Sequence, residues 1–103
     1  MIHPVETSIP LPYEAIAAFC QRHHIVRLWL FGSVLKETFS SDSDVDVLVE
    51  FDPDHMPGLN YFGMPDELSQ ILGRPVDFGT PDGLSPYIRD EVMQAAQVVY
   101  ERA

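Results

Sequence analysis

The sequence predicts an α/β fold of the α+β kind: a small mixed β-sheet backed by helices, in a single domain. Three observations lead to this fold class. Short apolar runs at 25–31, 45–51 and 76–78 have the length of strands. Apolar residues at helical spacing lie before, between and after these runs. The chain has 103 residues, which suits one domain spanning residues 1–103.

The first half of the chain alternates helix and strand. Residues 1–12 hold three prolines and are predicted to form an irregular arm. Pro12 fits the first turn of a helix that runs to about His23, because proline is tolerated at that position. Its apolar stripe consists of Ile16, Phe19 and Cys20. Two strands, 25–31 and 45–51, follow, with a short helix or turn at 34–39 between them.

The second half repeats the alternation. A loop at 52–58 precedes a helix within 59–72, where Pro65 either starts or kinks the helix. Gly73 fits the position just after that helix, and 76–78 forms a third strand. A closing helix within 84–101 is predicted by the spacing of Ile88, Val92, Ala95, Ala96 and Val99.

Charge and composition narrow the function classes. Six Lys and Arg against sixteen Asp and Glu give a net charge of −10, which argues against direct, non-specific nucleic-acid binding. Such a balance suits a basic protein partner, or solubility alone. Cys20 is the only cysteine and is expected to be a small buried hydrophobe. No apolar run approaches 18 residues, so we expect no membrane association and a cytoplasmic protein.

Two aspartates carry the strongest chemical signal. Asp44 and Asp46 stand at the start of the second strand, two residues apart, so both side chains are expected on one face. Two carboxylates placed together repel each other unless cations lie between them. A pair of Mg²⁺ ions about 3.5–4 Å apart is the arrangement that nucleotidyl transfer uses. The pair therefore predicts a metal site.

The turn after the first strand supplies a second part of the site. Gly32 and Ser33 interrupt the apolar run and are expected to open a short helix, whose backbone N–H groups can hold a phosphate. Ser33 has two candidate roles, capping that helix or donating to a triphosphate oxygen. Lys36 can neutralise a phosphate or simply be solvated. Together with the aspartates, this turn predicts a nucleoside-triphosphate site.

A calcium-binding EF-hand loop is a competing interpretation of Asp42 to Asp46, and it fails. Its sixth position is Val47, where the turn requires glycine, and its twelfth is Pro53, where a bidentate Glu belongs. Asp42 and Ser43 are expected to form an ordinary turn.

Gly-Ser, ten residues and then Asp-x-Asp resembles the signature of the nucleotidyltransferases of the DNA polymerase β superfamily. The short chain is similar to the minimal nucleotidyltransferases of MNT or MntA type, which are encoded beside HEPN-domain toxins in prokaryotes. Residues 73–78, Gly-Arg-Pro-Val-Asp-Phe, resemble the family's "GRxVDL" strand. Taken alone, Asp77 is an ordinary acid at a strand end; the resemblance makes it the third catalytic carboxylate.

The resemblance implies a nucleotidyltransferase-like fold and a Mg²⁺-dependent transfer of AMP from ATP. Asp44, Asp46 and Asp77 would be catalytic and bind metal, with Asp77 a ligand or the base for the attacking hydroxyl. Gly32, Ser33 and Lys36 would bind the nucleotide. The acceptor would be a tyrosine hydroxyl of a HEPN-type ribonuclease toxin, and the chain its antitoxin.

The chain departs from its relatives directly after Gly-Ser. Many of them have Arg-Ala-Arg-Gly there, whereas this chain has Val34, Leu35, Lys36 and Glu37. Two alternatives therefore stay open. One is an antitoxin with a decayed site that masks its toxin by binding alone. The other is an enzyme acting on a small-molecule hydroxyl, although about 100 residues leave little room for an acceptor-binding domain.

Overall fold

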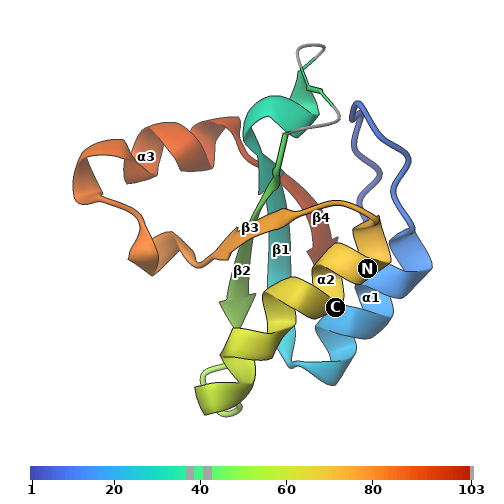
Figure 1. Ribbon diagram of the computed structural model, residues 1–103. Helices are drawn as coiled ribbons and strands as arrows, with labels where there is room; N and C mark the ends of the chain where they lie inside the picture. Colours follow the sequence, from blue (N-terminus) through green and yellow to red (C-terminus); the bar gives the residue numbers. More distant parts are fainter. Residues whose placement is uncertain (37–38, 41–42, 103) are drawn as a thin grey trace.

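The computed structural model describes residues 1–36, 39–40 and 43–102. Glu37, which is part of the departure after Gly-Ser, and Asp42, which is part of the expected turn with Ser43, lie outside this range. A four-stranded mixed sheet runs through the molecule in the order β3-β2-β1-β4 (Figure 1). Its strands are β1 (Ile25–Phe31), β2 (Val45–Phe51), β3 (Val76–Gly79) and β4 (Gln97–Glu101). β1 is antiparallel to β2 and β4, and β2 is parallel to β3. The predicted fold class is therefore confirmed.

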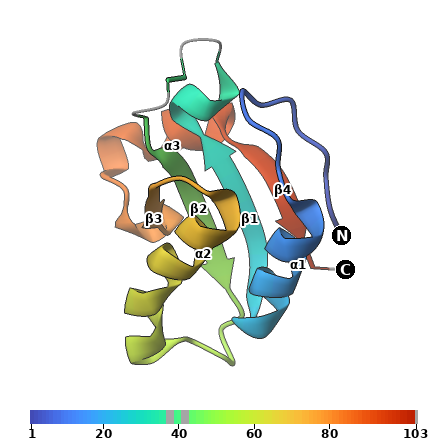
Figure 2. The same cartoon turned by 45° about the vertical axis from the view of Figure 1, so that its right-hand side comes forward.

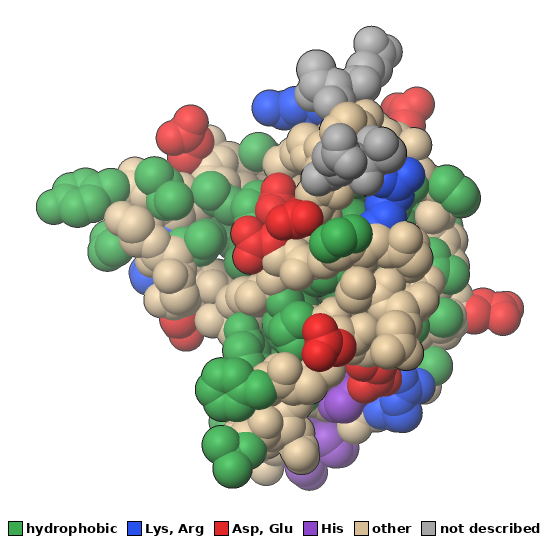
Figure 3. All heavy atoms as spheres, in the orientation of Figure 1, with side chains coloured by type: hydrophobic (Ala, Val, Ile, Leu, Met, Phe, Trp, Pro, Cys, Tyr) green, Lys and Arg blue, Asp and Glu red, His purple; other side chains and the backbone are tan. Residues whose placement is uncertain are grey.

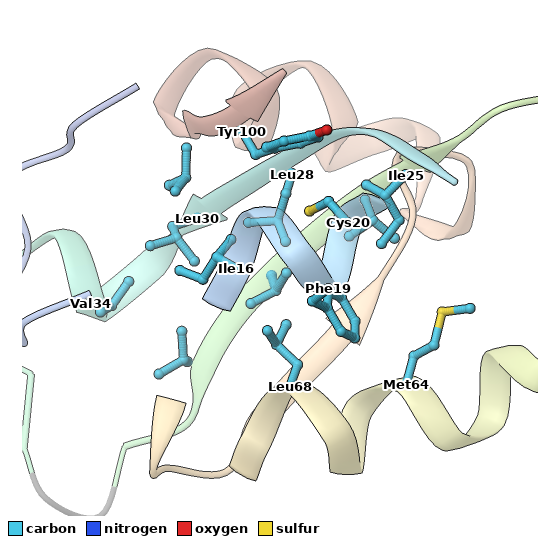
Figure 4. Packing of buried hydrophobic residues seen from close by; sticks show 14 of the residues in the cluster. Ile16, Phe19, Cys20, Ile25, Leu28, Leu30, Val34, Met64, Leu68 and Tyr100 are labelled. Carbon is cyan, nitrogen blue, oxygen red and sulfur yellow. The ribbon is translucent and has the colours of Figure 1, made fainter. Parts of the chain in front are cut away.

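Two helices, α1 (Tyr13–Arg22) and α2 (Met64–Leu72), cover one face of the sheet (Figure 2). The predicted stripe of α1 is buried, with Phe19 and Cys20 fully enclosed. These side chains meet Leu28 and Leu30 of β1 and Leu68 of α2 in one core (Figure 4). Burial also raises the pKa of the Cys20 thiol to about 12, so this cysteine is an inert core residue.

The predicted helix within 59–72 forms in two parts. A 3₁₀ helix, η2 (Gly58–Gly63), leads directly into α2. Pro65 lies in the first turn of α2, so it starts this helix and does not kink it. Gly73 ends the helix in the left-handed conformation, with φ +70°, as expected of a residue in that position.

The predicted closing helix was wrong in its second half. Helix α3 (Pro86–Ala95) ends at Ala95, and Ala96 is extended, with φ −68° and ψ 146°. Residues 97–101 form β4, in which Val99 is fully buried. Val99 matches the helical spacing of Ile88 and Val92 only by coincidence. Residues 97–101 are extended because they pair with the edge of β1.

The other face of the sheet is largely uncovered. Side chains alternate along a strand, and Leu28 and Leu30 point into the core, so Arg27, Trp29 and Phe31 point to the opposite side. Their register partners on β2 are Glu50, Leu48 and Asp46, which lie on that same open face. Helix α3 stands on this side, away from α1 and α2 (Figure 2), and has no buried residue.

The arm at 1–12 follows the outer edge of the sheet. The N–H of His3 donates to the carbonyl of Val99 at 2.8 Å, and Ile2 bridges to Tyr100. The free edge of β4 is thereby partly paired, which protects it from pairing with other chains. Within the residues that the structure describes, no helix is long and apolar enough to cross a membrane.

Candidate active site

The three predicted aspartates come together at one edge of the open face. Asp46 of β2 and Asp77 of β3 are direct register partners on neighbouring parallel strands. Such strands lie about 4.8 Å apart, and paired residues point to the same face. Asp44 comes two residues before Asp46 and therefore shares that face. Figure 3 shows acidic side chains gathered where β2 and β3 begin.

The electrostatics of Asp46 reflect this crowding. Its burial, followed by the neighbouring charges of Asp77 and Asp44, raises the pKa of the Asp46 carboxyl above its usual value. Among the described residues, no Lys, Arg or His side chain forms an ion pair with any of the three. The cluster is therefore an uncompensated negative site on an otherwise packed sheet.

Gly32 is fitted to Asp46. It follows β1 with φ +75°, a backbone conformation that residues other than glycine rarely adopt. A Cβ built on Gly32 would overlap the Asp46 carboxylate, whose Cγ lies only 3.3 Å from that position. The glycine thus lets the turn after β1 touch the carboxylate directly, which joins the two halves of the predicted site.

The turn itself is a 3₁₀ helix, η1 (Gly32–Leu35). Ser33 lies inside this turn, and no side chain caps its start, so the capping role considered for Ser33 was wrong. Lys36 is exposed at its end, and its N–H donates to the carbonyl of Ser33 at 2.9 Å. Val34, the residue directly after Gly-Ser, is fully buried in the core.

The arm supports η1, which local sequence patterns did not indicate. The N–H of Ser8 donates to the carbonyl of Val34 at 2.9 Å, and the Ser8 hydroxyl donates to the carbonyl of Lys36. A groove of about 670 Å³ opens between the arm, η1 and α3, lined in part by Gly32, Lys36 and Gln97. Segments distant in sequence form this groove, so no short motif could reveal it.

Two arginines near the site have structural contacts. The backbone N–H of Arg74 donates to the carbonyl of Ser69, and its guanidinium lies 5.0 Å from the Phe39 ring centroid and donates to the carbonyl of Ser40. Arg89 donates to the carbonyls of Pro81, Asp82 and Leu84. It therefore ties α3 to the loop before it.

The donor set fits a hard divalent cation. Mg²⁺ prefers carboxylate oxygens as protein ligands, and three carboxylate groups lie at one edge of the sheet. In residues 1–36, 39–40 and 43–102, no three acidic, His or Cys side chains lie close enough together to hold a metal ion by themselves. Mg²⁺ usually keeps water and takes substrate phosphates as further ligands, which this open arrangement allows.

Comparisons with known proteins identify the family of this chain. The model of the nucleotidyltransferase domain family matches residues 13–99. A protein of Methanocaldococcus jannaschii named "Putative protein adenylyltransferase" is 31% identical over 75 residues, which cover 73% of this chain and 80% of the relative.

Solved structures extend the comparison. One titled "Structure of putative minimal nucleotidyltransferase" has a TM-score of 0.69 and 35% identity, and the match covers 82% of this chain and 86% of that one. A toxin–antitoxin structure with AMP-PNP, 18% identical with a TM-score of 0.67, covers 89% of this chain and 75% of its own, and shares the fold. The chain belongs to the nucleotidyltransferase family, as a minimal nucleotidyltransferase.

Proposed function

We propose that this nucleotidyltransferase transfers AMP from ATP to a tyrosine hydroxyl of a partner protein, a HEPN-type ribonuclease toxin, and so acts as its antitoxin. The whole chain, 1–103, would serve as one minimal catalytic domain in the cytoplasm. The observation that carries the proposal is the register pairing of Asp46 with Asp77, beside Asp44 and in contact with Gly32.

In this proposal the chain's own groups position the reactants. Backbone N–H groups of Gly32 and Ser33 would hold the β- and γ-phosphates, with Lys36 near the terminal phosphate. Asp44, Asp46 and Asp77 would hold Mg²⁺, which supplies charge neutralisation to the phosphates when bound. Little covalent help is needed for such a transfer, so placement and charge account for most of the catalysis.

The transfer itself is a displacement at the α-phosphorus. The acceptor hydroxyl oxygen forms a bond to this phosphorus, and the bond from phosphorus to the oxygen bridging to the β-phosphate breaks. Pyrophosphate leaves with that oxygen. Asp77 takes the hydroxyl proton, because it stands on the edge strand with its carboxylate exposed.

The relatives support a protein acceptor. One carries the name of a protein adenylyltransferase, and a structure of the same fold is titled as a toxin–antitoxin with AMP-PNP. Among the residues that the structure describes, one sheet with its helices carries the candidate site, and the proposal places the acceptor on another molecule.

One observation favours silencing by binding alone. Val34 is buried in the core, so the residue directly after Gly-Ser offers no cation to a phosphate, unlike the arginine of the signature that the chain resembles. Lys36 retains the other candidate cation. A decayed site would leave the fold and a partner-binding surface intact.

The deciding experiment mixes this chain with the product of its neighbouring gene, ATP and Mg²⁺, and measures the intact mass of the partner. We expect added mass in whole AMP units and release of pyrophosphate. Asp44→Ala should slow this transfer on the order of a thousandfold while the complex still forms. Asp66→Ala, which removes an exposed carboxylate from α2, is the matched control and should transfer normally.

Silencing of the partner without ATP, equally by wild type and Asp44→Ala, would instead establish binding alone. AMP found only on a small-molecule hydroxyl would establish the remaining alternative.

A further inference from the structure

The order of the strands gives the site a direction. The sheet order β3-β2-β1-β4 places Asp46 between the Gly32 turn that follows β1 and Asp77 on β3. On the proposed function, the phosphates that leave lie at the Gly32 side. In-line displacement requires the attacking oxygen to approach from the opposite side of the α-phosphorus. The acceptor must therefore enter from the β3 side, past Asp77.

Two recesses on the open face meet at Thr80, in the segment that directly follows β3. The smaller, of about 300 Å³, is lined by Asp77 itself together with Leu48, Tyr61 and Leu84. The larger, of about 530 Å³, is the acceptor-side groove; its lining includes Trp29, Glu50, Met56, Thr80, Asp82 and Met93. Figure 3 shows a notch beside α3 with hydrophobic side chains along it.

The groove and the carboxylates share one strand. Asp46, Leu48 and Glu50 alternate along β2 and point to the same open face. Four residue steps along the strand lead from Asp46 to Glu50, a span of about 13 Å. A segment seated in the groove can thus reach Asp77 with a few residues of backbone.

The chemistry of the groove indicates what it accepts. Its walls are apolar and include Trp29, Met93 and Met56, the last of which is 66% exposed. Arg27 is already paired, with Glu50 at 2.7 Å and Glu101 at 2.7 Å. Arg27 and its two glutamate partners together carry one excess negative charge, and Asp82 adds another at the rim of the groove. The whole chain has a net charge of −10.

We propose that the acceptor-side groove is the docking site for the acceptor protein, which inserts an apolar segment flanked by Lys or Arg. This inference rests on the proposed function and specifies where its partner binds. The groove holds the partner, and the smaller recess, which meets the groove at Thr80 and is lined by Asp77, receives the hydroxyl that reacts.

Two surface substitutions test the groove without touching the carboxylates. Met56→Arg places a cation in the apolar entrance, and Asp82→Lys reverses the charge at the rim. The Asp82 backbone carbonyl, which accepts from Arg89, is kept in the second variant. Leu59→Arg, at an 85% exposed apolar position outside the groove lining, and Glu14→Lys, at an exposed position of α1, are the matched controls.

The measurement is AMP transfer to the neighbouring gene's product at varied partner concentration, with ATP and Mg²⁺ saturating. We expect Met56→Arg and Asp82→Lys each to raise KM for the partner about tenfold or more, as loss of an interface anchor does, with kcat preserved. Both controls should keep the wild-type KM, and ATP binding measured by calorimetry should be equal in all five proteins.

The outcomes separate the two proposals. Transfer by wild type with an unchanged KM in both groove variants would overturn the groove and leave the proposed function standing. An equal loss in Leu59→Arg would also overturn it, because general surface apolarity would then suffice. No AMP on the partner with wild type would overturn the proposed function and the groove with it. A concentration-dependent dimer of this chain that Met56→Arg abolishes would show a second copy as the occupant and overturn the partner assignment.

Discussion

At the scale of single residues, Asp46 combines burial with two like-charged neighbours. The folded state raises its pKa above the usual 3.8, so the folded protein binds this proton more tightly than the unfolded chain does. Protonated Asp46 therefore contributes to the free energy of unfolding at low pH. This contribution is lost as the pH rises from 3.8, the usual pKa, through the raised pKa of the folded state. At neutral pH the carboxylate is a destabilising group that the site retains for its chemistry.

Asp46→Asn should accordingly stabilise the metal-free protein at pH 7. We expect a rise in Tm of roughly 2–4 °C, after allowance for solvent screening of a partly exposed group. Thermal unfolding followed by circular dichroism between pH 3 and 7, with chelator present, measures it. The gain should shrink toward pH 3 and should not occur for Asp66→Asn; a Tm that falls at pH 7 would contradict the electrostatic account.

Gly32 offers a second test at this scale. Gly32→Ala should destabilise the protein by about 1–2 kcal/mol for its left-handed backbone, with a further cost from overlap with Asp46. In an Asp46→Ala background only the backbone cost should remain. Urea unfolding of the wild type, the two single variants and the double variant gives the coupling free energy between the two positions. We expect this coupling to be about 1 kcal/mol or more. The same cost in both backgrounds would mean that the two residues do not touch.

At the scale of elements, the sequence alone predicted the strands and the turn that hold the candidate site. The predicted bounds of the strands at 25–31 and 45–51 agree with β1 and β2, and the turn at Gly32 follows β1 as expected. These elements have strong local signals, since apolar runs ended by Gly-Ser or preceded by Asp leave few alternatives.

The final strand had no comparable local signal. Its pairing with β1 is a long-range contact, and Val99 happened to continue the spacing of Ile88 and Val92. Likewise, the bond from Ser8 to Lys36 joins segments 28 residues apart. Sequence patterns report the neighbours along the chain, so contacts of this kind become visible only once the sheet order is known.

At the scale of the whole molecule, the two faces of the sheet differ: one forms the core and the other carries the candidate site. Helices α1 and α2 bury one face and stabilise the domain, while the other face carries the carboxylates, the two recesses and α3. The sequence indicated the carboxylates through their spacing; it could not indicate the grooves, which require the topology.

The central claim is that Asp44 and Asp46 hold a divalent cation together with nucleotide. Calorimetric titration of ATP with Mg²⁺, or with Mn²⁺, into the wild type tests it directly. We expect binding that depends on the metal and is lost in Asp44→Asn/Asp46→Asn, while Asp66→Asn/Asp90→Asn, which removes the same charge from exposed positions on α2 and α3, binds like wild type. Unchanged binding in Asp44→Asn/Asp46→Asn would contradict the claim.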